Sequence, residues 1–260
     1  MKCSDVIAKL EQIHPPYLAE SWDNVGLLTG NREKEVNRVF LALDATDDVI
    51  KRAGEWKADM LITHHPMIFS GMKQITGDHF IGRRVIRLIE SGISYYAMHT
   101  NFDICGMADL SAEYLKLSDT QVLEVTWEEN GRTEGLGRVG MLPQTMTLRD
   151  CGRFVKEQFC LSDVRIYGDP NMEVSRAAIC TGSGKSTLPA ALAAGAQVMI
   201  TGDIDYHTGI DWSAQGIGLI DAGHYGTEYI FMEYMKQELK REFPQLETAC
   251  MEIIPPYTLL

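Results

Sequence analysis

The amino-acid sequence predicts an α/β fold, and three observations support this prediction. Apolar runs alternate along the chain with amphipathic runs, a pattern typical of parallel strands joined by helices. Several of the apolar runs are nearly continuous, as expected of strands covered on both faces. The polar, turn-rich stretch Thr126–Thr133 separates two halves that each resemble a small α/β unit. We therefore expect two similar α/β domains with mixed, largely parallel sheets, formed by residues 1–125 with 220–260 and by residues 126–219.

Each element is predicted from its own pattern. Short apolar runs that end in polar or turn residues predict strands at Val39–Leu43, Met60–Thr63, Ser94–Met98, Val122–Val125, Gly137–Leu142, Val164–Tyr167, Ala177–Cys180, Val198–Thr201 and Gly218–Asp221. Amphipathic runs predict helices at Ser4–Ile13, Asp47–Trp56, His79–Ser91, Leu110–Leu117, Leu148–Phe159, Ser186–Ala194, Ile204–Ala214 and Tyr225–Phe243.

Charge and composition argue against several classes of function, although a local basic patch remains an alternative. The net charge is −12, from 36 acidic against 24 basic residues, and such a surface repels nucleic-acid phosphates. We therefore expect no nucleic-acid partner. No apolar run approaches ~18 residues, so no membrane span is expected. The first residues resemble an amphipathic helix and not a leader, and the six cysteines form no C-x-x-C pair, so we expect a cytoplasmic protein.

The chemistry of the chain is concentrated where apolar runs end. His64 and His65 directly follow one such run, and Pro66 after them restricts His65 to an extended conformation. Neighbouring side chains on a regular strand point to opposite faces, so two adjacent histidines serve one site only where the strand stops. The alternative is a polar pair at a strand end that binds nothing.

Two further segments follow apolar runs in the same way. His224 and Glu228 are four residues apart, which places them on one face of a helix that begins after Gly223. Asp103 lies after the run Tyr95–Met98, in a polar loop that ends at Gly106. Taken alone, the first pair fits a solvated helix start, and Asp103 is uninformative.

Together, these residues form a set of imidazole and carboxylate ligands for metal ions. Because ligands bind outside the carboxyl ends of strands in open α/β sheets, we expect the strand ends to line one cleft. Such ligands suit zinc, iron or manganese, and five are more than a catalytic mononuclear zinc uses. We therefore predict two divalent metal ions per subunit, bound by His64, His65, Asp103, His224 and Glu228, with the long Glu228 side chain as the bridge.

Three other polar residues at strand ends are ambiguous. His99, His207 and Asp44 could orient a ligand, and the two histidines could also act as catalytic acids or bases. An ordinary hydrogen-bonded histidine is the alternative for both. We retain His99 and His207 as candidate catalytic residues.

The segment Thr181–Thr187 resembles the end of a phosphate-binding P-loop. The full motif requires a glycine where this chain has Ile179, inside an apolar run, so the loop is too short to wrap a triphosphate. An anion-binding nest at Gly182–Gly184 is the alternative.

The combined motifs resemble the Nif-three-like family of dinuclear metal proteins, often labelled GTP cyclohydrolase I type 2 homologs. The matching segments run in order from Pro15 to Glu228: PPYLAESWDNVGLLTG, ALDAT, ITHHP, HTNFD, GSGKS, TGDIDYH and LIDAGHYGTE. The resemblance implies the same five metal ligands, two similar α/β domains with the metals in the cleft between them, and a homohexamer. By position, GSGKS is similar to a glycine- and serine-rich turn of the family.

Two interpretations of function follow. In the first, the metal centre activates water for hydrolysis of GTP, another nucleotide or a related small molecule, and His99 or His207 carries protons. In the second, the protein is not catalytic and stores or delivers metal ions, or acts as a regulatory partner.

Overall fold

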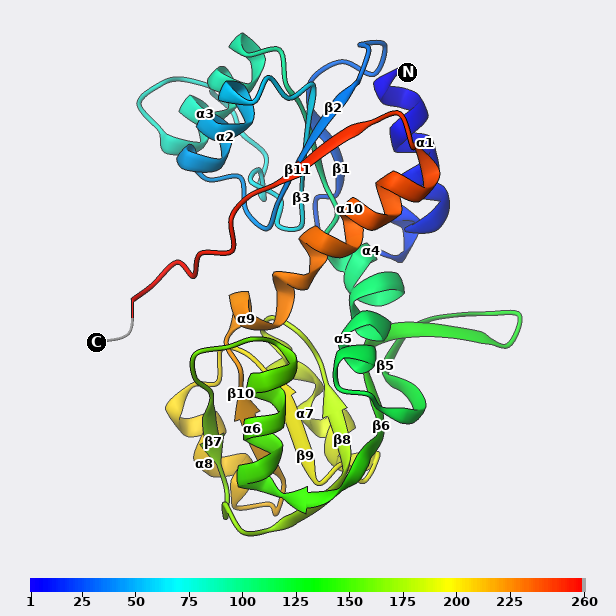
Figure 1. Cartoon of the computed structure of the whole chain (residues 1–260), viewed down its shortest axis with the longest axis vertical. Helices are drawn as coiled ribbons and strands as arrows, with labels where there is room; N and C mark the ends of the chain where they lie inside the picture. Colours follow the sequence, from blue (N-terminus) through cyan, green and yellow to red (C-terminus); the bar gives the residue numbers. More distant parts are fainter. Residues whose placement is uncertain (259–260) are drawn as a thin grey trace. The chain divides into compact units, whose positions relative to one another are not determined.

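The structure is a computed structural model that describes residues 1–258 and contains two compact units, each with its own β-sheet (Figure 1). The first unit comprises Met1–Phe102 and Tyr229–Ile254. The second comprises Asp103–Glu228 and the segment that follows Ile254. These bounds differ from the predicted boundaries at 125/126 and 219/220. The reason is that the flanking strands β5 (Ser118–Glu129) and β10 (Gly218–Asp221) both pair within the second sheet.

The first unit has a five-stranded sheet in the order β1-β4-β3-β2-β11. Its central pairings are parallel, and only β1 runs antiparallel to its neighbour β4. The strands are β1 (Gly26–Thr29), β2 (Arg38–Ala42), β3 (Met60–Thr63), β4 (Ser94–Ala97) and β11 (Glu247–Cys250). All four residues of β3 and of β4 are buried, which agrees with the nearly continuous apolar runs in the sequence.

Helices cover both faces of this sheet (Figure 1). Alternate strand residues such as Phe40, Leu61 and Tyr95 pack against α2 (Asp47–Glu55) and α3 (Phe80–Glu90). The opposite face is covered by α1 (Cys3–Ile13) and α10 (Ile230–Glu242). Two short turns, η1 (Pro16–Leu18) and α4 (Thr100–Phe102), complete the unit.

The second unit has a six-stranded mixed sheet in the order β5-β6-β8-β9-β10-β7. Only β8, β9 and β10 are parallel neighbours, so the expectation of largely parallel sheets holds for the first unit and not for this one. Besides β5 and β10, its strands are β6 (Arg132–Thr147), β7 (Arg165–Tyr167), β8 (Glu173–Ile179) and β9 (Val198–Thr201). Its helical elements are η2 (Asp103–Met107), α5 (Ala108–Tyr114), α6 (Leu148–Gln158), η3 (Gly184–Thr187), α7 (Leu188–Ala193), α8 (Tyr206–Ser213) and α9 (His224–Glu228).

The antiparallel half of this sheet explains why one predicted boundary is wrong. Thr126–Thr133 lies at the tip of the β5–β6 hairpin and does not link two domains. Asn130 and Gly131 both have positive φ, at 51° and 77°, as a tight hairpin turn requires. The polar residues there are solvent-exposed strand ends around a turn.

Most predicted elements are present, and three strands match to the residue: Met60–Thr63, Val198–Thr201 and Gly218–Asp221. The edge strands β1 and β11 were not predicted. Among residues 1–258, no helix is both long enough and apolar enough to cross a lipid bilayer.

Candidate metal centre

The first unit gathers three histidines after two neighbouring parallel strands. His64 and His65 come directly after β3, and His99 follows β4. The ring centroid of His64 lies 4.9 Å from that of His65 and 5.3 Å from that of His99. One ring nitrogen from each of the three lies within 4.8 Å of the others, close enough to hold an ion. β3 therefore ends before His64, as predicted, and the imidazoles of His64 and His65 turn to the same side.

Hydrogen bonds fix how these histidines are oriented. His64 Nδ1 lies 2.8 Å from the carbonyl oxygen of Met98. A carbonyl oxygen only accepts, so Nδ1 carries the proton and Nε2 carries the lone pair that a metal ion needs. The Nδ1 atoms of His65 and His99 lie 2.9 Å from carboxylate oxygens of Asp44 and Asp23. Such partners orient metal-binding imidazoles in known sites, and Asp44 takes this orienting position.

The carboxylate of Asp23 is held in its ionised form. Burial raises its pKa, but hydrogen bonds from His99 and Thr100 outweigh burial and lower the pKa to about 2. At neutral pH the Asp23 carboxylate therefore accepts a hydrogen bond from His99 Nδ1. Asp23 was not predicted as a site residue from the sequence. It belongs to the WDN segment, which supported only the resemblance to the family.

The second unit brings together the other three predicted ligands. His224 Nε2 lies 3.1 Å from Glu228 Oε2, which confirms that the two residues share one helix face. A carboxylate oxygen of Asp103 lies within 4.8 Å of one from Glu228. His224 Nδ1 lies 2.7 Å from Asp203 Oδ2, so this histidine is oriented by a carboxylate in the same way as His65.

The neighbouring carboxylate of Glu228 changes the pKa of His224. Glu228, mainly through its hydrogen bond, and Asp203 together raise the pKa of His224 to about 9, against the opposing effect of burial. Without a metal ion, a proton therefore occupies the His224–Glu228 contact at neutral pH. A metal ion bound by this pair would have to replace that proton.

Local backbone structure explains the position of His224 and Glu228. Gly223 has φ +77°, the left-handed conformation that lets the chain turn from β10 into α9. The buried carboxylate of Asp221 accepts a hydrogen bond from the Gly223 amide at 3.0 Å. The predicted single helix Tyr225–Phe243 is two helices, and the ligand pair spans the short first one, α9.

Asp103 lies in a helix, and not in the predicted polar loop. It begins the π-helical turn η2, between α4 and α5, where Cys105 departs from helical geometry with φ −110° and ψ 15°. Three of its five residues are buried and the other two are half-buried, so the sequence lacks the amphipathic period from which a helix is predicted. Single π-turns of this kind are frequent at functional sites because they change the direction of side chains.

The turn Gly182–Gly184 lies against the ligand pair and does not form a phosphate-binding loop. The Gly182 amide donates to Thr227 Oγ1 and the Gly184 amide donates to Thr201 Oγ1, each at 2.9 Å. Both amides therefore donate to side chains of the protein and do not point at an anion, which argues against an anion-binding nest at Gly182–Gly184. A β-carbon on Gly182 would lie 2.1 Å from Glu228 Oε1, so the turn touches the carboxylate directly.

His207 lies apart from these groups. It is exposed in the first turn of α8, with its ring 5.4 Å from that of Tyr206. Within residues 1–258, it belongs to no cluster of three or more potential metal ligands. Cys180 is buried beside the ligands, and burial raises the pKa of its thiol to about 12. It is therefore a neutral thiol, which binds metal poorly.

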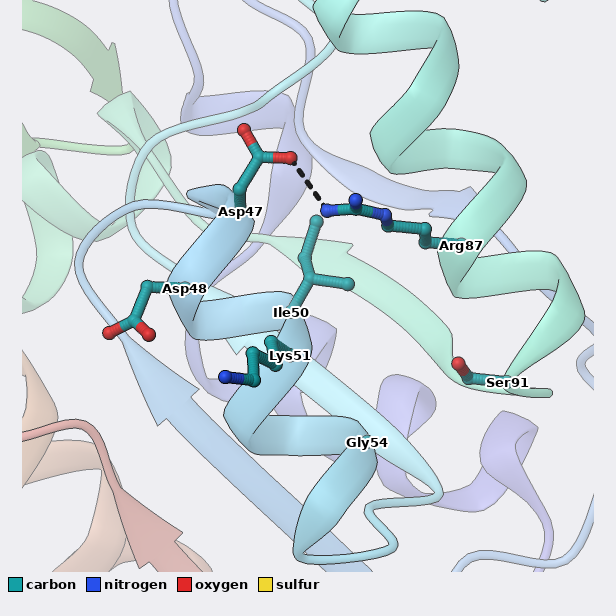
Figure 2. A pocket seen from close by; sticks show the side chains of 7 residues that line it. All are labelled: Asp47, Asp48, Ile50, Lys51, Gly54, Arg87 and Ser91. Atoms are coloured by element: carbon teal, nitrogen blue, oxygen red, sulfur yellow. Dashed lines mark hydrogen bonds and ion pairs between the residues drawn. The ribbon is translucent and has the colours of Figure 1, made fainter. Parts of the chain in front are cut away.

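A hollow of about 440 Å³ between α2 and α3 is a separate feature (Figure 2). Arg87 Nη1 donates to Asp47 Oδ1 at 2.9 Å across it, and Arg84 binds the other oxygen of the same carboxylate. Its charged groups thus neutralise one another, and it contains no imidazole. The histidine and carboxylate clusters are the better candidate site.

Comparisons with known proteins show the family of this chain. The family model described as Duf34/NIF3 (NGG1p interacting factor 3) matches residues 1–256. Proteins named GTP cyclohydrolase 1 type 2 homolog from Clostridium perfringens and Clostridium acetobutylicum are 35% and 36% identical over 242 residues, which cover 92% of this chain and 92% and 90% of theirs.

Solved structures show the same fold. A Bacillus cereus protein related to NIF3 shares the fold, with a TM-score of 0.91 at 23% identity over 100% of this chain and 99% of that one. Reduced HcgD from Methanocaldococcus jannaschii aligns with a TM-score of 0.82 at 29% identity, over 97% of this chain and 98% of that one. This chain therefore belongs to the Duf34/NIF3 family.

Proposed function

We propose that this protein is a metal-dependent hydrolase with a dinuclear centre. The ligands are His64 and His65 from the first unit and Asp103, His224 and Glu228 from the second, with Glu228 as the bridge. The observation that carries the proposal is the orientation of the three ligand histidines. Each has its Nδ1 atom at 2.7–2.9 Å from a protein oxygen, so each presents Nε2 as the metal ligand.

The donor set fits two divalent ions of the intermediate type. Three imidazole nitrogens and two carboxylates suit zinc, iron or manganese, and they lack the sulfur ligands that select copper(I). When bound, such ions supply Lewis acidity and lower the pKa of coordinated water.

The first unit also supplies a candidate general base beside the ligands. Asp23 remains ionised and holds the proton of His99 on Nδ1, so His99 Nε2 is the atom that can accept a proton from water. This arrangement favours His99 over the exposed His207 as the proton carrier. The role of His207 stays a prediction.

We propose a nucleotide or a related small molecule as the substrate. The support is the name GTP cyclohydrolase 1 type 2 homolog, carried by relatives that are 35% and 36% identical over most of the chain. The homohexamer and the cytoplasmic location stay predictions.

The test combines metal content with turnover. Elemental analysis of the purified protein is expected to find about two divalent ions per chain, and the metal-loaded protein is expected to turn over GTP or another nucleotide. Glu228→Gln should lose metal and activity together. His79→Asn is the matched control, because His79 caps α3 outside the ligand set and Asn is also a good cap.

His99→Gln separates catalysis from simple metal binding. In this variant the five ligands are unchanged, so metal content should persist while turnover falls by roughly 10²–10⁴-fold, the usual contribution of a general base. If the wild-type protein contains metal but turns over no compound in a panel of nucleotides and related metabolites, the result would favour the non-catalytic storage or regulatory role. Activity unchanged in Glu228→Gln would exclude the proposed centre.

A further inference from the structure

Two large aromatic side chains lie exposed on the first unit. Trp22 and Phe69 are 56% and 53% exposed, and their ring centroids are 5.8 Å apart with an interplanar angle of 37°. The spacing is that of interacting aromatic rings. Trp22 belongs to the segment before β1, and Phe69 belongs to the long connection between β3 and α3. We define these two side chains as the aromatic platform.

The platform adjoins the histidines of the candidate centre. The ring of Trp22 meets the ring of His99 edge to face, at 6.0 Å between centroids and 72° between planes. The ring of His99 in turn lies 5.3 Å from that of His64 and 5.5 Å from that of His65. All of these residues belong to the first unit, so their proximity depends on that unit alone.

Hydrogen bonds fix the main chain beneath the platform. The Asn24 side chain donates to the carbonyl oxygen of Ile68 at 2.6 Å, which ties the segment of Trp22 to the segment of Phe69. Asp23, next to Trp22, binds both His99 and Thr100. The main chain next to both rings is thus held by hydrogen bonds, while more than half of each side chain is exposed to solvent, as in a preorganised binding surface.

We propose that the aromatic platform stacks the planar, nitrogen-containing ring of a nucleobase-class substrate and holds it beside the metal centre. This inference rests on the proposed function, because it names the part of the substrate that the same site recognises. Stacking of a base on an aromatic side chain tolerates any base with a π-face. The net charge of −12 opposes recognition led by phosphate, so recognition of the ring is the favoured mode.

The test measures nucleoside binding to the metal-loaded protein by calorimetry. Guanosine and adenosine are the probes, and ribose is the matched compound without an aromatic ring. Trp22→Ala and Phe69→Ala should each weaken nucleoside binding by roughly tenfold or more, the loss expected when one stacking side chain is removed. Trp22→Phe should restore most of the affinity, because it keeps an aromatic face.

Phe80→Ala is the control, since Phe80 is 49% exposed in the same unit but lies against Arg84 on α3. It should bind nucleosides as the wild type does. Metal content is measured in every variant. The proposal for the platform is wrong if Trp22→Ala and Phe69→Ala leave the nucleoside affinity unchanged. It is also wrong if the wild-type protein binds metal but no nucleoside. Neither result contradicts the proposed metal centre.

Two other outcomes separate the inference from its alternatives. Protein that binds nucleosides through Trp22 but contains no metal contradicts the proposed function and not the platform. A change of sedimentation coefficient in Trp22→Ala, with nucleoside affinity unchanged, would assign the platform to contact with a second copy of the chain and overturn the inference.

Discussion

At Gly182 a single missing β-carbon decides whether the carboxylate of Glu228 keeps its place. A β-carbon there would lie 2.1 Å from Glu228 Oε1 and 3.3 Å from His224 Nε2. We therefore expect Gly182→Ala to displace Glu228 and lower metal affinity at least tenfold, an effect like that of losing an orienting partner. Competition with a chelator measures this. Gly195→Ala is the matched control: it also has positive φ, at +73°, but no atom lies within 4 Å of its added carbon.

The carboxylates that orient the ligand histidines give a second prediction at the residue scale. Asp44 accepts from His65 and Asp203 accepts from His224, so Asp44→Ala and Asp203→Ala remove the partner without removing a ligand. Each substitution should lower metal affinity by about 10–100-fold, measured by titration against a chelator of known affinity. Asp48→Ala, whose partner is Arg52 on the exposed side of α2, should leave the affinity unchanged.

The raised pKa of His224 makes metal binding dependent on pH. Since Glu228 raises this pKa to about 9, His224 is protonated at pH 7 in the metal-free protein. A metal ion requires deprotonated Nε2, so binding at pH 7 should release about one proton from this residue, and none well above pH 9. Affinity should therefore increase as pH rises from 7 to 9. Calorimetry in buffers of different ionisation enthalpy counts the protons, and an identical count at pH 7 and pH 9.5 would contradict the assignment.

The residue types of the site could be predicted from the sequence, but their hydrogen-bonding partners could not. His64, His65, His224 and Glu228 follow apolar runs, and that pattern alone indicates a strand end. Asp23 follows no such run, and its contact with His99 joins residues 76 positions apart. A contact of this range depends on the sheet order β1-β4-β3, which no local pattern records.

Among the elements, the β5–β6 hairpin depends on a close approach between its strands. A β-carbon on Gly135 would lie 1.9 Å from the carbonyl oxygen of Glu124 on the paired strand. Because backbone atoms cannot move without breaking the pairing, Gly135→Ala should lower the free energy of unfolding by about 1–3 kcal/mol. Chemical denaturation measures the loss. Thr133→Ala, at an exposed position of β6, should change stability by less than about 0.5 kcal/mol, and a loss equal to that of Gly135→Ala would contradict this explanation.

Strands buried along their whole length were predictable, and the two edge strands of the first sheet were not. β3 and β9 are buried along their whole length, so their apolar runs have sharp ends. β11 has no fully buried residue, and its sequence ETAC lacks the alternation of a half-buried strand. β1 begins at a glycine with φ +102°, a conformation that interrupts a strand pattern. Pairing with β2 and β4, and not local preference, holds these two edge strands in place.

At the scale of the whole molecule, the chain order divides the predicted ligands between the two units. His64 and His65 belong to the first unit, and Asp103, His224 and Glu228 belong to the second. The sequence patterns misplaced the unit boundaries, because the strand pairing that defines a unit joins segments far apart in the chain. The chain passes from the first unit to the second between Phe102 and Asp103, returns between Glu228 and Tyr229, and passes again after Ile254; the first two passages lie beside a predicted ligand.

If the five residues bind the ions as proposed, metal should stabilise both units together. Ions present at 100 times their dissociation constant add about 2.7 kcal/mol per site to the free energy of unfolding, and a chelator removes it. Trp22 and Trp56 report on the first unit, and Trp127 and Trp212 report on the second, so variants that keep one pair of tryptophans follow each unit by fluorescence. With a chelator present, the melting temperatures of both units should fall. If only one unit responds, the ions bind to ligands of that unit alone, and the bridging role of Glu228 is wrong.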